Sequence, residues 1–174
     1  MVFLTYLFSL LNLACKMGAS LVKGKRMGLI LLLSFTGNVF LALSYTFAGR
    51  GINGAASCYL GCALTLISYF FADGKRKRPR WLPYLYEVLF VAVNLIFGTE
   101  PLLTAIAIGA TVSFVISIIR SSGAQYRFWT AINQATWLLF DLVSGSYGSM
   151  ISHIVLLSTT LLGIFFHDRK KAHA

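Results

Sequence analysis

Four side chains within long apolar stretches have the chemistry to bind a small molecule: Asn38, Asn133, Trp137 and Asp141. Asn133, Trp137 and Asp141 recur every four residues, so a helix would carry all three on one face. The amides would hydrogen-bond a solute, the indole would stack on it, and the carboxylate would gate or couple its passage. The competing interpretation is that the two asparagines only join helices through interhelical hydrogen bonds.

Asp141 and His153 form a second candidate group, because both are expected near the same end of neighbouring helices. Histidine titrates near physiological pH, so the pair would respond to protons. The simpler interpretation, which we favour, is that Asp141 contacts water at the membrane boundary and that His153 bonds a neighbouring helix.

Enzymatic motifs are missing from the sequence. It has no glycine-rich phosphate loop, no His-Glu-x-x-His and no Gly-x-Ser-x-Gly. Glu87 and Asp141 are the only carboxylates within the apolar stretches, and they fall on different helices. Cys15, Cys58 and Cys62 have no clustered histidine or carboxylate that would complete a metal shell. We therefore expect no enzyme activity, no metal site and no cofactor.

The composition indicates that the surface of the protein is covered by lipid. Of the 174 residues, 57% are hydrophobic and 11% are charged, whereas a soluble domain has about 25% charged residues. The net charge of +10 comes from short clusters between apolar stretches. These clusters do not form the basic, aromatic-rich surface that nucleic-acid binding needs. We therefore expect the lipid bilayer, and no nucleic acid, as a partner.

The apolar stretches predict an all-α, polytopic membrane protein with seven helices, each able to cross about 30 Å of hydrocarbon. The connections after the first, third and fifth helices and the C-terminal tail hold thirteen Lys and Arg residues, and the opposite connections hold only Arg50. Because cytoplasmic loops are the basic ones, we expect the N-terminus outside and the C-terminus in the cytoplasm. Lys16 would extend its ammonium from the first helix to the cytoplasmic interface. The expected helices span about 2–22, 27–48, 53–72, 82–98, 101–119, 125–143 and 147–166.

An internal repeat is predicted to organise these helices. Residues 28–76 align with 123–171 at a shift of 95 residues, without a gap and with ten identities, among them Asn38 with Asn133. Phe-Phe-x-Asp-x-Lys closes the third helix of each unit. Parallel repeats are an established transporter plan, and this one would bring the two asparagines face to face near mid-membrane. The predicted divisions of the single transmembrane domain 1–174 are a first three-helix repeat at 1–76, a basic loop and linker helix at 77–99, and a second three-helix repeat at 100–171.

Short motifs in the second half resemble the YgjV family of bacterial inner membrane proteins. They are Glu100-Pro101-Leu102-Leu103 through Gly109, then Trp129, Trp137, Asp141, Ser144-Gly145-Ser146 and Ser152. The family in turn resembles SWEET, PQ-loop and PnuC-type proteins, in which a linker helix joins two triple-helix bundles. That resemblance implies a small-solute pathway between the bundles. The chain departs from the pattern in two places: its first helix lacks the hinge proline, and Asp141 stands four residues after Trp137 where the pattern has asparagine.

The leading hypothesis is therefore a carrier of an unknown small solute in the bacterial inner membrane. Its pocket would lie between the bundles, lined by Asn38, Asn133, Trp137 and Asp141. The alternative is a non-transporting scaffold or accessory subunit, in which neighbouring helices satisfy every polar side chain. A third hypothesis is an enzyme acting on lipid headgroups, for which only Asp141 and His153 supply catalytic groups. The sequence leaves open whether the chain forms a homo-oligomer.

Overall fold

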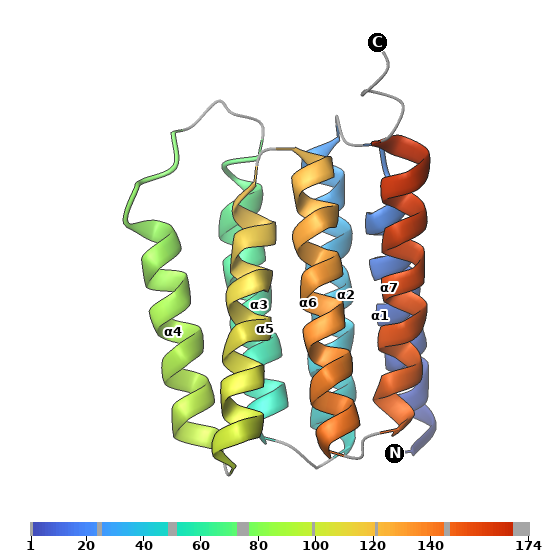
Figure 1. Cartoon of the computed structure of the whole chain (residues 1–174), viewed down its shortest axis with the longest axis vertical. Helices are drawn as coiled ribbons and strands as arrows, with labels where there is room; N and C mark the ends of the chain where they lie inside the picture. The colour runs from blue at the N-terminus through green and yellow to red at the C-terminus, as the bar shows by residue number, and fades with distance from the viewer. Residues whose placement is uncertain are drawn as a thin grey trace.

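The computed structural model describes residues 2–23, 26–48, 52–72, 77–98, 100–120, 122–144 and 147–168, and these form seven helices (Figure 1). The all-helical prediction is confirmed, and the helices begin and end within a few residues of the expected positions. Arg50, and Gly145 and Ser146 of the motif shared with the YgjV family, lie outside the described residues. The helices are α1 Val2–Leu21, α2 Met27–Ala48, α3 Ile52–Tyr69, α4 Leu82–Phe97, α5 Pro101–Ile119, α6 Gly123–Ser144 and α7 Tyr147–His167.

Successive helices run in opposite directions, so the connections alternate between the two ends of the bundle (Figure 1). One end, drawn at the top of Figure 1, carries the turns after α1, α3 and α5 and the end of α7. We call it the basic end, because every Lys and Arg in the described connections lies there. These residues are Lys23, Arg26, Lys77, Arg78, Arg80 and Arg120. Glu100 lies at the opposite end, between α4 and α5.

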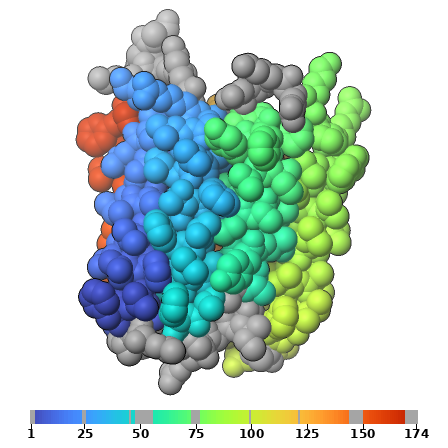
Figure 2. Space-filling model, turned by 180° about the vertical axis from the view of Figure 1, so that it is seen from behind, coloured from blue at the N-terminus to red at the C-terminus, as the bar shows by residue number. Residues whose placement is uncertain are grey.

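Neighbours in sequence are neighbours in space around the bundle. Each helix from α1 to α6 packs against the next, α7 returns to pack against α1, and α3 also contacts α5. Helices α4 to α7 lie in front of α1 to α3 in Figure 1, and Figure 2 shows α1 to α4 side by side from behind. The two halves of the chain therefore meet where α1 contacts α7 and where α3 contacts α5.

Exposure in this bundle is suited to lipid. Large apolar side chains face outward, including Phe3, Val88 and Ile96, which are 75%, 63% and 72% exposed. Many interior positions carry Ser or Thr, and several of these hydroxyls bond carbonyls of their own helix, as Thr111 does to Ala107 at 3.0 Å. Within the described residues, four helices are long and apolar enough to cross a membrane: α1, α2, α5 and α7. The inverted pattern of apolar exterior and polar interior is what a hydrocarbon solvent selects.

Candidate functional site

Asn133 lies inside the bundle and joins α6 to α5. It is 6% exposed, and its Nδ2 donates to the carbonyl of Ala110 at 2.6 Å. Its Oδ1 accepts from Nε2 of the next residue, Gln134, at 3.3 Å. The amide therefore has a strong protein partner on the neighbouring helix, which is how interhelical hydrogen bonds work in membranes.

Asn38 joins α2 to α3, but its bond is much weaker than that of Asn133. It is also 6% exposed, and its Nδ2 lies 3.5 Å from Oγ1 of Thr65. That hydroxyl donates in turn to the carbonyl of Gly61 at 2.7 Å. The partners of Asn38 and Asn133 thus lie on different helices, and each amide bonds within its own half of the chain.

Trp137, Asp141 and His153 meet at the end of the bundle opposite the basic end. The Asp141 Oδ2 lies 2.6 Å from Nδ1 of His153, which joins α6 to α7. The Trp137 ring stacks on the imidazole, with ring centroids 6.2 Å apart and planes inclined by 12°. Asp141 is only 3% exposed, so the expectation that it contacts water is wrong.

Lys16 is where the sequence prediction fails most clearly. Its ammonium does not extend to the membrane interface: Nζ donates to Oγ of Ser34 at 3.3 Å and lies 5.6 Å from the centre of the Phe114 ring. Ser34 is fully buried and also accepts from Oη of Tyr126 at 3.3 Å. Side chains of a helix point toward its N-terminus, and for α1 that direction leads away from the basic end. A cation consequently lies inside the bundle, among α1, α2 and α5.

Arg127 is one of the thirteen basic residues expected in the cytoplasmic connections and tail, yet it is 0% exposed and lies in the second turn of α6. Its guanidinium holds the carboxylate of Asp168 through two bonds, Nε to Oδ2 at 3.0 Å and Nη2 to Oδ1 at 2.5 Å. Nη1 donates to the carbonyl of Val22, just beyond α1, at 2.8 Å. The carbonyls at a helix end lack partners within the helix. One arginine therefore ties α1, α6 and α7 together at the basic end.

The contact between α1 and α7 is close enough to exclude a side chain at Gly163. A Cβ built there would lie 2.3 Å from the carbonyl oxygen of Ser20. Beside it, Oγ of Ser20 lies 3.0 Å from Oγ1 of Thr160, and Nε2 of His167 lies 2.8 Å from the carbonyl oxygen of Leu21. Small and polar residues are what helices in lipid use to approach one another.

Arg78 makes a similar contact at the other meeting of the two halves. Its Nη1 donates to the carbonyl of Ile119, the last residue of α5. Burial lowers the pKa of the Arg78 guanidinium, and the nearby Tyr86 hydroxyl opposes that effect. An arginine thus bonds a carbonyl at the C-terminal end of α1 and another does so at the end of α5.

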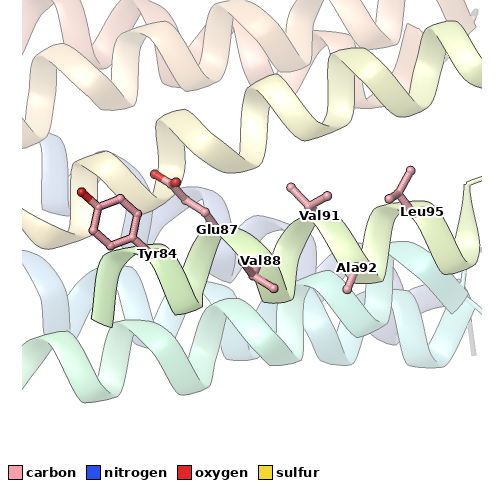
Figure 3. A pocket seen from close by; sticks show the side chains of 6 residues that line it. All are labelled: Tyr84, Glu87, Val88, Val91, Ala92 and Leu95. Carbon is pink, nitrogen blue, oxygen red and sulfur yellow. The ribbon is translucent and has the colours of Figure 1, made fainter. Parts of the chain in front are cut away.

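One pocket among the described residues lies away from the predicted ligand residues. It has a volume of about 440 Å³, opens on the surface of α4 and contains none of the predicted ligand residues (Figure 3). Its lining comes entirely from α4: Tyr84, Glu87, Val88, Val91, Ala92 and Leu95. Within the described part of the chain, no three His, Cys, Asp or Glu side chains are grouped to hold a metal ion.

A polar stripe in α1 is the signal that would have identified the interior lysine. Asn12, Lys16 and Ser20 recur every four residues, like the predicted ligand residues of α6. Asn12 and Ser20 are 9% and 2% exposed. The stripe turns inward because lipid offers no hydrogen-bond partners. No comparable signal links Arg127 to Asp168, since their pairing depends on how α6 and α7 dock.

Comparison with known proteins covers almost the whole chain. Residues 4–171 match the model of a family, Imp-YgjV, that is described as bacterial inner membrane protein. No curated protein and no solved structure matches the chain.

Proposed function

This chain belongs to the Imp-YgjV family of bacterial inner membrane proteins, and we propose that within that membrane it carries a small solute between helices α1–α3 and α5–α7. One observation carries the proposal. The amide oxygens of Asn12 on α1 and Gln134 on α6 are buried without a hydrogen-bond partner among the described residues. Buried polar atoms in native proteins are nearly always bonded. Orphaned amides in two facing halves favour a ligand over a structural role.

The proposed architecture is two parallel three-helix bundles, at residues 1–76 and 100–171, joined by the linker that contains α4. Exchanging the halves about an axis along the membrane normal would exchange the α1–α7 contact with the α5–α3 contact, and both occur. One position that bonds its neighbouring helix in both halves also supports the repeat. Thr46 Oγ1 lies 3.0 Å from Oη of Tyr59, and the counterpart of Thr46 at a shift of 95 residues is Asp141, which bonds His153.

The proposed orientation follows from the charges. Cytoplasmic loops of inner membrane proteins are rich in Lys and Arg, so the basic end would face the cytoplasm. The N-terminus, at the other end of α1, would then lie outside and the C-terminus inside. Labelling of single cysteines placed at either end, in intact and in permeabilised cells, tests this orientation.

Within the carrier, Asn38 and Asn133 would hydrogen-bond the solute and Trp137 would stack on it. Asp141 would couple its passage to protons through His153. The weak 3.5 Å bond of Asn38 supports a role beyond joining helices, because an amide held so loosely is free to exchange its partner for a ligand. The described conformation would then be one in which the helices have closed on this site.

A thermal-unfolding screen of the purified protein against sugars, nucleosides, vitamins and amino acids is the first test. A ligand that binds only the folded protein raises its melting temperature. Uptake of each stabilising compound is then measured in proteoliposomes. The Asn38→Ala/Asn133→Ala double variant should lose uptake, whereas Thr36→Ala, which removes a hydroxyl bonded to Leu32 of its own helix, should retain it. Normal uptake by the double variant would disprove the assignment of these residues.

The second candidate is a non-transporting scaffold or accessory subunit. It is favoured by the bond between Asn133 and Ala110 and by the place of the pocket on α4 rather than between the halves. It predicts that no small molecule stabilises the protein and that a partner copurifies with it. In either role we propose no catalysis, because Asp141 and His153 are the only facing acid and base that we find among the described residues.

A further inference from the structure

The Lys16 ammonium is held in the interior by contacts that leave most of its hydrogen-bonding capacity unused. An ammonium has three hydrogen-bond donors, yet the described partners are one hydroxyl, Ser34 at 3.3 Å, and the face of the Phe114 ring at 5.6 Å. Ser34 is the eighth residue of α2, which places it about 10 Å inside the basic end at 1.5 Å per residue. The ammonium therefore lies within the bundle and away from the membrane surface.

No described carboxylate balances this charge. Asp168 is bound by Arg127 and Asp141 by His153, and neither Glu87 nor Glu100 forms an ion pair with Lys16. The contrast with Arg127 is informative, because that buried cation has both a carboxylate and a carbonyl. A charge in a low-dielectric interior is costly unless it is paired. Arg127 thus has an anion within the protein, whereas the anion that would balance Lys16 has to come from a bound molecule.

The surroundings of Lys16 add the features of a binding site. Asn12 is one helical turn before Lys16, is 9% exposed, and its Oδ1 has no partner among the described residues. Both side chains lie over Gly37 of α2, where a Cβ would come within 3.2 Å of the Asn12 oxygen and 3.3 Å of the Lys16 Cγ. The Asn12 amide also carries two N–H groups, which a rotation about χ2 would turn toward a bound anion.

This group adjoins the asparagine that is predicted to bind the solute. Asn38 follows Ser34 by one helical turn on α2, and both side chains are buried. A Cβ at Gly61 would lie 3.5 Å from the Asn38 amide nitrogen and 3.6 Å from the Phe114 ring. Phe114 therefore lies near both Lys16 and Asn38, and a solute reaching both residues would have a charged end and a hydrogen-bonding body.

We propose that Lys16, with Ser34 and Asn12, binds the oxyanion of the solute, a carboxylate or a phosphate group. This inference rests on the proposed carrier function and narrows it to anionic solutes. Phe114 would move from the ammonium when the anion arrives, because an ion pair in a low dielectric is stronger than a cation–π contact. Nothing covalent changes; the anion replaces the ring as the partner of the charge.

The test compares three lysine variants by thermal unfolding of the purified protein in a neutral detergent. Succinate and inorganic phosphate are titrated at constant ionic strength, with neutral succinamide as the matched control. Dihexanoyl phosphatidylglycerol and dihexanoyl phosphatidylcholine distinguish a lipid headgroup from a free oxyanion. Lys16→Met removes the charge at similar length, Lys16→Arg keeps it, and Lys23→Met removes an exposed loop lysine at the same end.

The expected result is that succinate or phosphate raises the melting temperature of the wild type, Lys16→Arg and Lys23→Met. Lys16→Met should bind these anions at least tenfold more weakly. Without anion, Lys16→Met should be as stable as the wild type, because it removes an unbalanced charge; a merely structural lysine would leave that variant less stable. Anion-dependent stabilisation that survives in Lys16→Met, or is absent from the wild type, would overturn the inference.

Two further outcomes separate this inference from the carrier function. In the first, a neutral sugar or nucleoside stabilises the wild type and Lys16→Met equally and enters proteoliposomes. That result would support the carrier function and contradict the anion site. Stabilisation by phosphatidylglycerol alone, dependent on Lys16, would support the oxyanion site and count against the carrier.

Discussion

In the proposed repeat, the helix pair α2–α3 corresponds to the pair α6–α7, yet the two pairs are held by different chemistry. Toward the end opposite the basic end, Thr46 and Tyr59 join α2 to α3 through two neutral hydroxyls 3.0 Å apart. Asp141, the counterpart of Thr46 at a shift of 95 residues, joins α6 to α7 through His153, 2.6 Å away. The same position thus carries a neutral hydrogen bond in one half and an ionisable one in the other.

The difference extends to the basic end. There α7 is fixed by the bidentate pair of Arg127 and Asp168, whereas the residue 95 positions before Arg127 is Leu32, an exposed apolar side chain. Helices α6 and α7 therefore have an ionisable pair at each end. Buried charge pairs fix geometry strictly, because removing one partner leaves the other unpaired in a low dielectric. Loss of a charge should therefore disrupt the contacts between α6 and α7, whereas the neutral contacts between α2 and α3 should tolerate substitution better.

Arg127→Met should cause the largest loss of stability, and it tests the difference between the two halves at the basic end. It leaves the Asp168 carboxylate and the Val22 carbonyl without their donors, and loss of one partner from a buried pair costs about 3 kcal/mol. Unfolding by sodium dodecyl sulfate in mixed micelles measures this free energy.

The matched control is Leu32→Met, at the corresponding position of α2, where the side chain is exposed and unfolding should be unchanged. Adding Asp168→Asn to Arg127→Met should restore part of the loss, because no unpaired carboxylate remains. Equal stabilities of Arg127→Met and the wild type would show that the ion pair contributes nothing to the second half.

Gly163→Ala is the next largest, and it tests how closely α7 approaches α1. The new Cβ would meet the Ser20 carbonyl at 2.3 Å, and such overpacking costs about 2 kcal/mol. The corresponding position in α3 is Ser68, which already has a side chain. Gly18→Ala is the control, because its Cβ would meet only Leu33 at an ordinary 3.6 Å. If both variants were destabilised alike, a general intolerance of alanine in these helices would explain the result better than the close contact.

The predictability of these two regions differs for a physical reason. Helix number and bounds follow from apolar length and from turn residues, which are local properties, and all seven were predicted. The burial of Asn38 and Asn133 also followed from the absence of hydrogen-bond partners in lipid. The positions of Lys16 and Arg127 depend on which helices dock beside them. The polar stripe of α1 indicated that Lys16 faces the interior but not how far its ammonium reaches, and local sequence could not distinguish an arginine of a loop from one buried between helices.

Asp141→Asn tests the difference between the two halves at the end opposite the basic end. The amide keeps the shape of the side chain but loses its charge, so its bond to His153 should weaken by about 1.5 kcal/mol, as expected for hydrogen bonds to charged groups. Thr46→Val removes the neutral bond to Tyr59, and such bonds in membranes contribute about 0.6 kcal/mol. Detergent unfolding of both variants gives the two values. A larger loss for Thr46→Val would reverse the ranking of the two halves.

Asn133→Ala and Asn38→Ala give the smallest expected effects, and they decide whether the paired amides only join helices. Asn133 donates at 2.6 Å and Asn38 at 3.5 Å, so their loss should cost about 1 and about 0.5 kcal/mol, the range of interhelical hydrogen bonds. Detergent unfolding measures both. If removing an amide costs little stability but abolishes stabilisation by the ligand, that amide binds the ligand. Asn38 is therefore expected to show the greater functional loss for the smaller structural one. If the two variants lose stability equally and leave ligand stabilisation unchanged, both amides are structural, and only the charged contacts then distinguish the halves.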